Sequence, residues 1–296
     1  GRRFVASHMN GHVSVYDFPG LARLAGPRLA GFPLGMAPEG EGGTLITMRK
    51  NAAGSLELAR WGMPDLRPLG VSPLPGAGEN AGYGALSPDG RKFAMGLGLG
   101  EVGLWDFAEA APRFTRLRID LPQATATLAV KFSPDGRHLA AAFMNSTSVY
   151  LWEIGAQSSY RALPPHKGYV TEIVFSPDGR TLISADGDRF IKVCDVETGR
   201  ELGMLLGHRM GVASIDLAPD GRTLASVSSD GSLRLWNLAT RREVARFEQP
   251  GLGPTVAFAP DGTGLLYELR EKGFPSTGIL RAPPPDNADA ATTAPK

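Results

Sequence analysis

The sequence predicts an all-β fold in which one small antiparallel sheet is repeated along the chain. The first observation behind this prediction is a recurring turn, Ser-Pro-Asp-Gly or Ala-Pro-Asp-Gly, at residues 87–90, 133–136, 176–179, 218–221 and 259–262. The second observation is the spacing, because by subtraction of those positions successive turns begin 46, 43, 42 and 41 residues apart. A period of roughly 40–45 residues built from short strands is typical of a β-propeller, in which each repeat forms one blade.

Each turn joins two predicted strands. Around the third copy, residues 170–175 and 181–185 alternate apolar and polar side chains and are rich in β-branched residues, as the strands of a hairpin are. In the turn itself, proline presets φ at the second position. Glycine then adopts the left-handed conformation that leads the chain into the next strand.

A third and a fourth strand complete the predicted unit. We expect third strands at residues 102–107, 149–154, 189–195 and 231–237, and shorter, more polar fourth strands such as 200–206 and 243–247. A sheet of four short strands is too small to be stable alone, so both of its faces must be buried against neighbouring blades.

Seven predicted blades occupy residues 1–282. Their predicted boundaries are 1–31, 32–76, 77–122, 123–165, 166–207, 208–249 and 250–282. Residues 1–7 match the segment that follows a Ser-Pro-Asp-Gly turn, so we expect that the first blade is incomplete and that the sequence is part of a longer protein. Blade 32–76 is the least regular, because it is rich in glycine and proline and its Trp61 is displaced from the repeat. Residues 283–296 are rich in Ala, Pro and Asp and are expected to form a disordered tail.

The best-preserved repeat lies between residues 207 and 238. Gly207 and His208 precede an apolar strand, the Ala-Pro-Asp-Gly turn and the segment LASVSSDGSLRLWNL. In these positions the chain resembles the WD40-repeat family of β-propellers, in the form found in bacterial proteins. The resemblance implies a buried hydrogen-bond set of a His, a strand Ser, a turn Asp and a strand Trp, which maps onto His208, Ser226, Asp230 and Trp236.

The preceding repeat shows the same pattern at an offset of 42 residues, by subtraction of 166 from 208. The resemblance places His166, Ser184 and Asp188 in its buried set. Cys194 stands where the tryptophan is expected. The hydrogen-bond set of this blade is therefore expected to be incomplete.

Composition argues against several classes of function. The chain has 31 Lys and Arg against 30 Asp and Glu, and its formal net charge of +1 predicts no attraction to nucleic acid or to a membrane surface. No apolar run approaches the roughly 20 residues that span a bilayer. A single cysteine cannot form an internal disulfide, which suits a reducing compartment, so we expect a cytoplasmic location.

The residues that could take part in catalysis or ligand binding are better explained as residues that stabilise the fold. His166 and His208 occupy matching positions, which favours a role in fixing the blade over one as general base or metal ligand. The glycines at residues 96–100 lead into a predicted strand rather than into the helix that a dinucleotide site requires. Asp186 and Asp188 supply too few oxygens for calcium. We therefore predict no catalytic residues, no metal site and no cofactor.

Two sets of loops are expected to ring one face of the propeller: those that join blades, and those between second and third strands. Arg, Tyr, Met and Phe are enriched at protein interfaces, although every loop of a propeller carries side chains of some kind. The candidate partner-binding residues in these loops are Met144, Asn145, Lys167, Tyr169, Arg189, Phe190, Arg209 and Met210.

The predicted function is a non-catalytic scaffold or sensor module that binds a protein or peptide on this face. This expectation follows from the family resemblance, because a fold alone does not imply a function. One alternative is that the propeller regulates a larger signalling enzyme, such as a kinase, fused upstream of it. A second alternative is a small ligand in the central channel, which would require charged side chains from several first strands to converge. Lys131, Glu172 and Asp216 are the candidates for such convergence.

Overall fold

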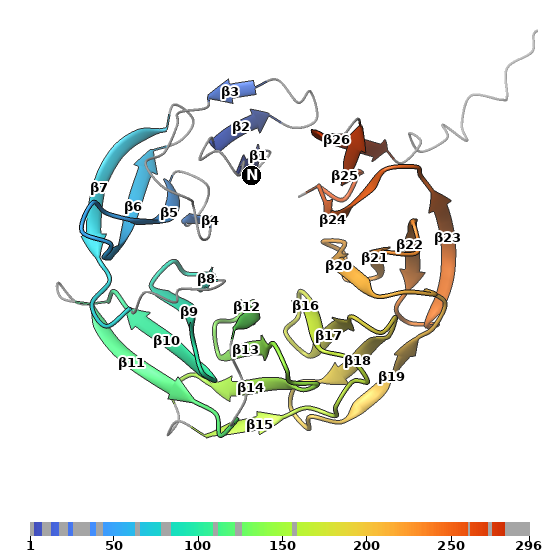
Figure 1. The fold of residues 1–296 in the computed structure, drawn as a ribbon, viewed down its shortest axis with the longest axis horizontal. Coiled ribbons are helices and arrows are strands. Elements are labelled where there is room, and N and C mark those ends of the chain that lie inside the picture. The colour runs from blue at the N-terminus through green and yellow to red at the C-terminus, as the bar shows by residue number, and fades with distance from the viewer. Residues whose placement is uncertain are drawn as a thin grey trace, which may run out of the picture.

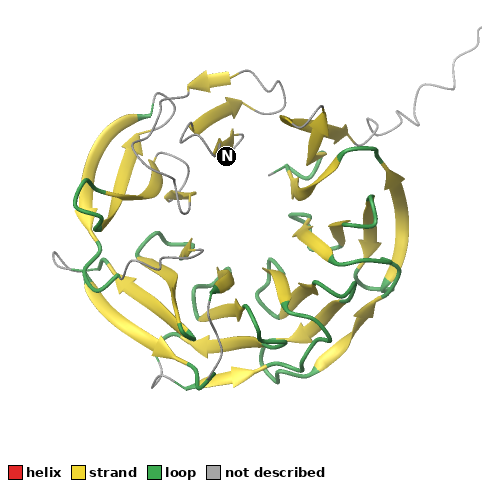
Figure 2. Cartoon of the chain, in the orientation of Figure 1, coloured by secondary structure: helices red, strands yellow, loops and turns green. Residues whose placement is uncertain are grey.

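The predicted all-β class is confirmed. The computed structural model describes residues 3–7, 13–17, 23–25, 36–39, 44–62, 66–77, 84–108, 112–121, 126–155, 159–259, 261–271 and 274–281. Every regular element among these residues is a β-strand, and they contain no helix (Figure 2).

The described strands form seven antiparallel sheets in chain order, which we call blades 1 to 7. Blades 2 to 6 have four strands each: β4–β7 (Met36–Glu39, Thr44–Lys50, Leu56–Gly62, Arg67–Pro73), β8–β11 (Gly84–Leu86, Lys92–Gly98, Glu101–Asp106, Arg113–Arg118), β12–β15 (Thr127–Phe132, His138–Phe143, Val149–Glu153, Tyr160–Ala162), β16–β19 (Val170–Phe175, Thr181–Asp186, Ile191–Asp195, Glu201–Leu205) and β20–β23 (Val212–Leu217, Thr223–Ser228, Ser232–Asn237, Arg242–Glu248). Blades 1 and 7 have three strands each: β1–β3 (Arg3–Ser7, Val13–Asp17, Arg23–Ala25) and β24–β26 (Leu252–Phe258, Gly264–Glu271, Phe274–Arg281).

The blades stand around a central axis (Figure 1). In each four-stranded blade the first strand in sequence lies nearest the axis and the fourth forms the rim. Consecutive strands pair with each other, so each blade is a meander and the chain passes from the rim of one blade to the inner edge of the next. The structure is therefore a β-propeller built from four-stranded antiparallel blades, as the turn spacing predicts.

Blade 1 corresponds to the last three strands of a complete blade. β1 pairs with β2 in the register Phe4↔Tyr16, and the second and third strands of blade 5 pair in the register Leu182↔Cys194. Phe4 is separated from Leu182 by the same number of residues as Tyr16 is from Cys194, so the two pairs are equivalent. β1 is thus equivalent to a second strand, and the described part of blade 1 holds no equivalent of an inner first strand.

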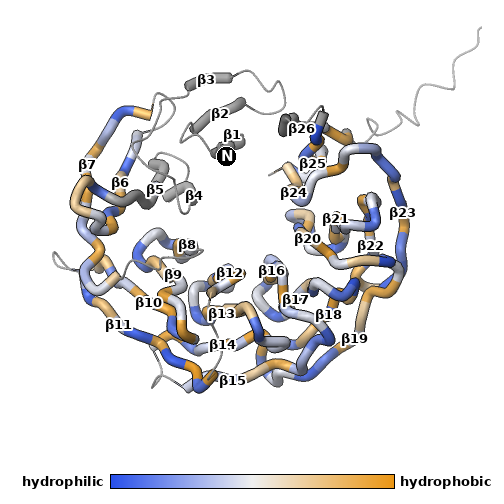
Figure 3. The backbone as a smooth tube through the Cα atoms, viewed as in Figure 1, coloured by the Kyte–Doolittle hydropathy of each residue, from blue (hydrophilic) through white to orange (hydrophobic). Residues whose placement is uncertain are grey.

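The core lies between neighbouring blades. Leu182 and Cys194 pack toward blade 4, whereas Ile183 and Val193, one residue along each strand, pack toward blade 6. Because alternate side chains serve opposite interfaces, the middle strands are apolar on both faces. The rim strands β11 and β23 have one neighbour fewer and carry more hydrophilic residues (Figure 3).

The Ser-Pro-Asp-Gly turns are closed by their own side chains. The Ser133 hydroxyl donates to Asp135 Oδ1 (2.6 Å), and the same oxygen accepts the amide of Arg137 (3.0 Å). The bond from Ser133 holds the pKa of Asp135 below its ordinary value, so the turn carries an ionised carboxylate at neutral pH. The same bonds recur in the turns that begin at Ser87 and Ser176.

Successive turns lie side by side on one face of the ring. A Cβ atom placed on Gly221 would lie 3.1 Å from Pro177 Cδ of the preceding turn, whereas one on Gly136 would lie 3.8 Å from Pro88 Cδ. Both glycines have left-handed φ angles, +71° and +70°. Backbone conformation therefore favours glycine at both positions, and crowding by a neighbouring turn adds to this only at Gly221.

Replacement of Gly221 by alanine should destabilise the protein more than the same change at Gly136. Each variant forces a side chain into the left-handed region, at a cost of about 1–2 kcal/mol. Only the methyl group at position 221 also approaches a proline closer than ordinary van der Waals contact. The free energies of unfolding from urea titrations measure both effects. Equal losses in the two variants would show that packing between the turns contributes nothing.

Candidate functional site

A chain of buried hydrogen bonds crosses blade 6. Trp236 on β22 donates its indole N–H to Ser226 Oγ on β21 (2.8 Å), and Ser226 Oγ lies 2.7 Å from His208 Nε2. His208 Nδ1 lies 3.1 Å from Asp230 Oδ2 in the turn between β21 and β22. The set therefore ties the loop before β20 to the second and third strands of its own blade.

Burial and hydrogen bonding fix the charges in this set. Burial lowers the pKa of His208, so its imidazole is neutral. Burial alone would raise the pKa of Asp230, but hydrogen bonds from Ser232, the Arg209 amide and His208 outweigh it and hold that pKa far below its ordinary value. An ionised carboxylate only accepts, so His208 donates from Nδ1 and accepts the Ser226 hydroxyl proton at Nε2. Both ring nitrogens are thus engaged inside the protein, which suits a structural role and not a general base.

Blade 5 has the same arrangement with a different acid. His166 Nε2 lies 2.7 Å from Ser184 Oγ, and its Nδ1 lies 3.2 Å from Asp186 Oδ2. The repeat offset assigns this role to Asp188, and the structure corrects that assignment, because Asp188 is exposed and Asp186 is buried at the end of β17. Asp186 Oδ1 accepts the amides of Asp188 (3.0 Å) and Phe190 (2.7 Å), so the turn folds over this carboxylate.

The strand position of the tryptophan holds Trp61 in blade 2 and Cys194 in blade 5. Trp61 pairs with Leu45 in the register of the equivalent residues of blade 6, and it donates to Thr47 Oγ1 (2.8 Å). Trp61 is therefore in register, contrary to expectation, because the turn between β5 and β6 is longer: 14 residues separate donor and acceptor here, against 10 in blade 6. In blade 5 the position holds Cys194, whose pKa burial raises to about 11, so the thiol stays protonated.

Blade 4 has the tryptophan without its partner. The indole N–H of Trp152 is buried and has no hydrogen-bond partner among the described residues. The strand register places Ala141 where blade 6 has Ser226, so the accepting hydroxyl is missing. In blade 3, by contrast, Trp105 Nε1 donates to the carbonyl oxygen of Pro75 (2.8 Å).

Four of the predicted partner-binding residues meet in the loops of blade 5. Lys167 Nζ lies 5.3 Å and Arg189 Cζ 5.5 Å from the centroid of the Phe190 ring. The Tyr169 side chain is 50% exposed, and its ring lies over Gly187, where a Cβ atom would approach it to 3.0 Å. One aromatic ring thus holds two cations beside an exposed tyrosine.

The adjacent loop of blade 6 adds Arg209 and Met210. Met210 is 55% exposed, and its carbonyl oxygen accepts the Ser228 hydroxyl (3.0 Å). The Arg209 amide donates to the buried carboxylate of blade 6 (2.9 Å). A Cβ atom on Gly211 would lie 2.6 Å from Gly187 O, so the loops of the two blades touch. We call the six residues gathered here the loop platform: Lys167, Tyr169, Arg189, Phe190, Arg209 and Met210.

The remaining predicted residues, Met144 and Asn145, belong to the turn between β13 and β14 in blade 4. Met144 is exposed, and Asn145 has a left-handed φ of +66°. The equivalent turn of blade 3 carries Leu99, which is 77% exposed and also left-handed at +52°. Sequence reasoning missed Leu99, although an apolar residue between two glycines in a turn is a signal that could have identified it.

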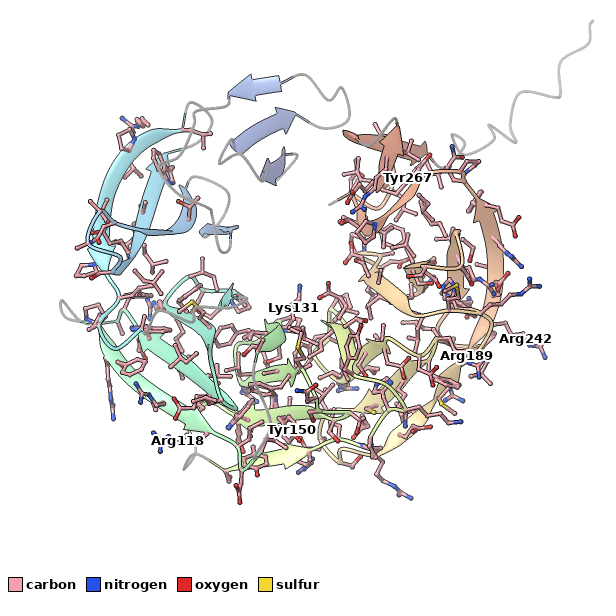
Figure 4. All side chains as sticks on the ribbon, in the orientation of Figure 1. Arg118, Lys131, Tyr150, Arg189, Arg242 and Tyr267 are labelled. Carbon is pink, nitrogen blue, oxygen red and sulfur yellow. The ribbon has the colours of Figure 1, made fainter. Side chains whose placement is uncertain are left out.

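The charged side chains of the first strands lie near one another, since Lys131 and Glu172 form an ion pair and both act electrostatically on Asp216. Lys131 lies at the inner edge of blade 4 (Figure 4), and its Nζ is 3.5 Å from Glu172 Oε1 of blade 5. Asp216 instead accepts the amide of Phe258 in blade 7 (2.6 Å), and burial raises its pKa. These groups bridge neighbouring blades and are satisfied by protein partners.

Neither clustered metal ligands nor a membrane-spanning helix occurs in the described part of the chain. This part contains no group of three His, Cys, Asp or Glu side chains that could hold a metal ion. It likewise contains no helix long and apolar enough to cross a membrane.

Replacement of Asp186 by alanine should lower the free energy of unfolding by about 1–3 kcal/mol, because His166 and two amides would lose their buried acceptor. Asp188→Ala is the matched control, and it should change that free energy by less than about 0.5 kcal/mol, as exposed positions usually do. Chemical denaturation measures both. A larger loss at Asp188 would restore the assignment made from the repeat offset.

Replacement of Ala141 by serine should stabilise the protein by about 1 kcal/mol, since the new hydroxyl would accept the unpartnered Trp152 indole N–H. Ala140→Ser, at the neighbouring buried position that faces the other interface, is the control and should destabilise. Thermal midpoints of the two variants and the parent provide the comparison. Destabilisation by both substitutions to the same degree would contradict the equivalence of Ala141 and Ser226.

Two stretches of the chain, residues 157–195 and 199–237, match the family model described as WD domain, G-beta repeat. They run through β15–β18 and β19–β22, so they include the three inner strands of blades 5 and 6, which carry the histidine sets described above. The Protein LST8 homolog of Drosophila melanogaster is 35% identical in an alignment of 128 residues that covers 40% of this chain and 39% of that protein.

Two further relatives show the same partial coverage. The WD repeat-containing protein SL1-17 of Schistosoma mansoni is 36% identical over 117 residues, or 39% of this chain and 36% of the relative. Protein groucho of Drosophila melanogaster is 27% identical over 118 residues, or 40% of this chain and 16% of the relative. The chain thus spans well under two thirds of each of these proteins. These matches show two WD40 repeats, at residues 157–195 and 199–237, in a chain that is similar to WD-repeat proteins over part of its length.

Proposed function

We propose that this chain is a non-catalytic protein-interaction module that binds a protein or peptide partner through the loop platform. WD40-repeat proteins are typically interaction scaffolds and are generally non-catalytic. The observation that carries the proposal is the gathering of Tyr169, Met210 and three cations on the touching loops of blades 5 and 6. Aromatic, methionine and arginine side chains are enriched at protein interfaces, and Tyr and Arg are frequent among the few residues that supply most of the binding energy there.

The loops beneath these side chains support this role because they are held in place. The amides of Phe190 and Arg209 donate to the buried carboxylates of blades 5 and 6. A surface that is ordered before binding loses less conformational entropy when a partner docks. The same buried sets argue against chemistry, since their histidines are occupied by protein partners.

Partner capture tests the proposal. The intact chain would serve as bait in a lysate of its native cell, and the captured protein, once identified, would be titrated against variants. Tyr169→Ala combined with Met210→Ala should weaken its affinity by about tenfold or more, equivalent to at least 1.4 kcal/mol. Leu202→Ala combined with Val244→Ala is the matched control, because these apolar side chains are 42% and 58% exposed on the rim strands β19 and β23.

The control should bind like the parent, and the thermal midpoints of both double variants should stay close to that of the parent. Unchanged affinity in the Tyr169 and Met210 variant would reject the platform as the binding site. Loss of affinity in the rim variant alone would place the partner on the outer strands instead.

A further inference from the structure

The loop platform carries an imbalance of exposed charge. The three loop segments that form it, residues 166–169, 187–190 and 208–211, expose Lys167, Arg189 and Arg209 against one carboxylate, Asp188. On the opposite face the turns pair each exposed arginine with an exposed aspartate two residues earlier, as Arg137 and Asp135 show. The exposed charge of these three loop segments therefore departs from the near-neutral balance of the whole chain.

The platform cations also have no ion-pair partner within the described part of the chain. No carboxylate among the described residues lies within ion-pair distance of Lys167, Arg189 or Arg209, whereas lysines of the strands such as Lys131 and Lys192 are paired with glutamates. Two of these cations contact the same Phe190 ring, so two like charges lie in one part of the platform, where Asp188 is the one exposed carboxylate of the three loop segments. An anionic group placed there would interact with both.

The acidic side chains beneath the platform do not fill this role. Asp186 is fully buried, and its oxygens accept bonds from His166 and from backbone amides. Asp230 accepts from His208 and the Arg209 amide and lies 3.4 Å from the buried Arg234 guanidinium. Their oxygens are directed into the blade and not toward solvent.

We propose that the partner segment bound by the platform is an acidic peptide in which Asp or Glu residues flank an apolar side chain. This rests on the proposed function and specifies the chemistry of the partner. The carboxylates lie against Lys167, Arg189 and Arg209, and the apolar side chain lies against Tyr169 and Met210. Complementary charge of this kind sets specificity and speeds association.

Selection from a random peptide library tests the proposal without a known partner. The intact chain is immobilised, and retained sequences should combine Asp or Glu with Leu, Phe or Tyr. A retained peptide, synthesised with a fluorescent label, should bind more weakly as salt concentration rises, because exposed charges are screened. Its version with Asn and Gln in place of Asp and Glu should bind about tenfold more weakly or worse.

Charge reversal locates the site. Lys167→Glu with Arg189→Glu should lower the affinity for the acidic peptide by about tenfold or more, while Arg137→Glu with Arg180→Glu, on the turn face, should change it less than about twofold. If the double variant Lys167→Glu with Arg189→Glu has a lower thermal midpoint than the parent, the affinity is measured with Lys167→Gln combined with Arg189→Asn instead. Asparagine tolerates the left-handed backbone that Arg189 adopts at φ +76°.

The outcomes separate this inference from the proposed function. Retention of neutral or basic peptides whose binding depends on Tyr169 would overturn the acidic class and leave the platform as a binding site. Absence of any Tyr169-dependent peptide would overturn both. The proposal would also be overturned if acidic peptides bound equally well to the Lys167 and Arg189 variants. It would likewise be overturned if a single-stranded oligonucleotide bound as tightly as the peptide through the same two residues.

Discussion

The structure depends on one constraint: a sheet of three or four short strands must bury both of its faces. In this chain neighbouring blades meet that need for each other, so Leu182 and Ile183 serve two different interfaces although they are adjacent in sequence. A blade cannot be removed without exposing two apolar faces, which makes the blades cooperative. The repeat of roughly 40–45 residues is the sequence consequence of that geometry.

Buried hydrogen bonds fix the loops relative to the strands that this apolar packing holds together. In blades 5 and 6 a histidine in the connecting loop bonds a strand serine on one side and a turn carboxylate on the other. Each carboxylate then accepts amides from the loops on the exposed face, including those of Phe190 and Arg209. The core of the blade therefore determines where the platform side chains stand, and the same residues that stabilise the fold prepare the surface for binding.

The sequence predicts the elements well and the individual bonds less well. Turn chemistry and alternation locate strands such as β16 and β17, because both signals are local. The acid of blade 5 escapes prediction because Asp186 ends β17 and Asp188 lies in the turn that follows, and only the folded turn decides which carboxylate faces His166. Trp61 escapes because a longer turn hides a pairing register that is set by the neighbouring strand. Exposed positions such as Leu99 leave no periodic signal.

The central claim is that the buried sets hold the platform loops in place, and amide hydrogen exchange measures this most directly. In the intact chain the amides of Phe190 and Arg209, which donate to Asp186 and Asp230, should exchange as slowly as amides of the middle strands. Exchange of these two amides at the rate of an unstructured loop would contradict the claim.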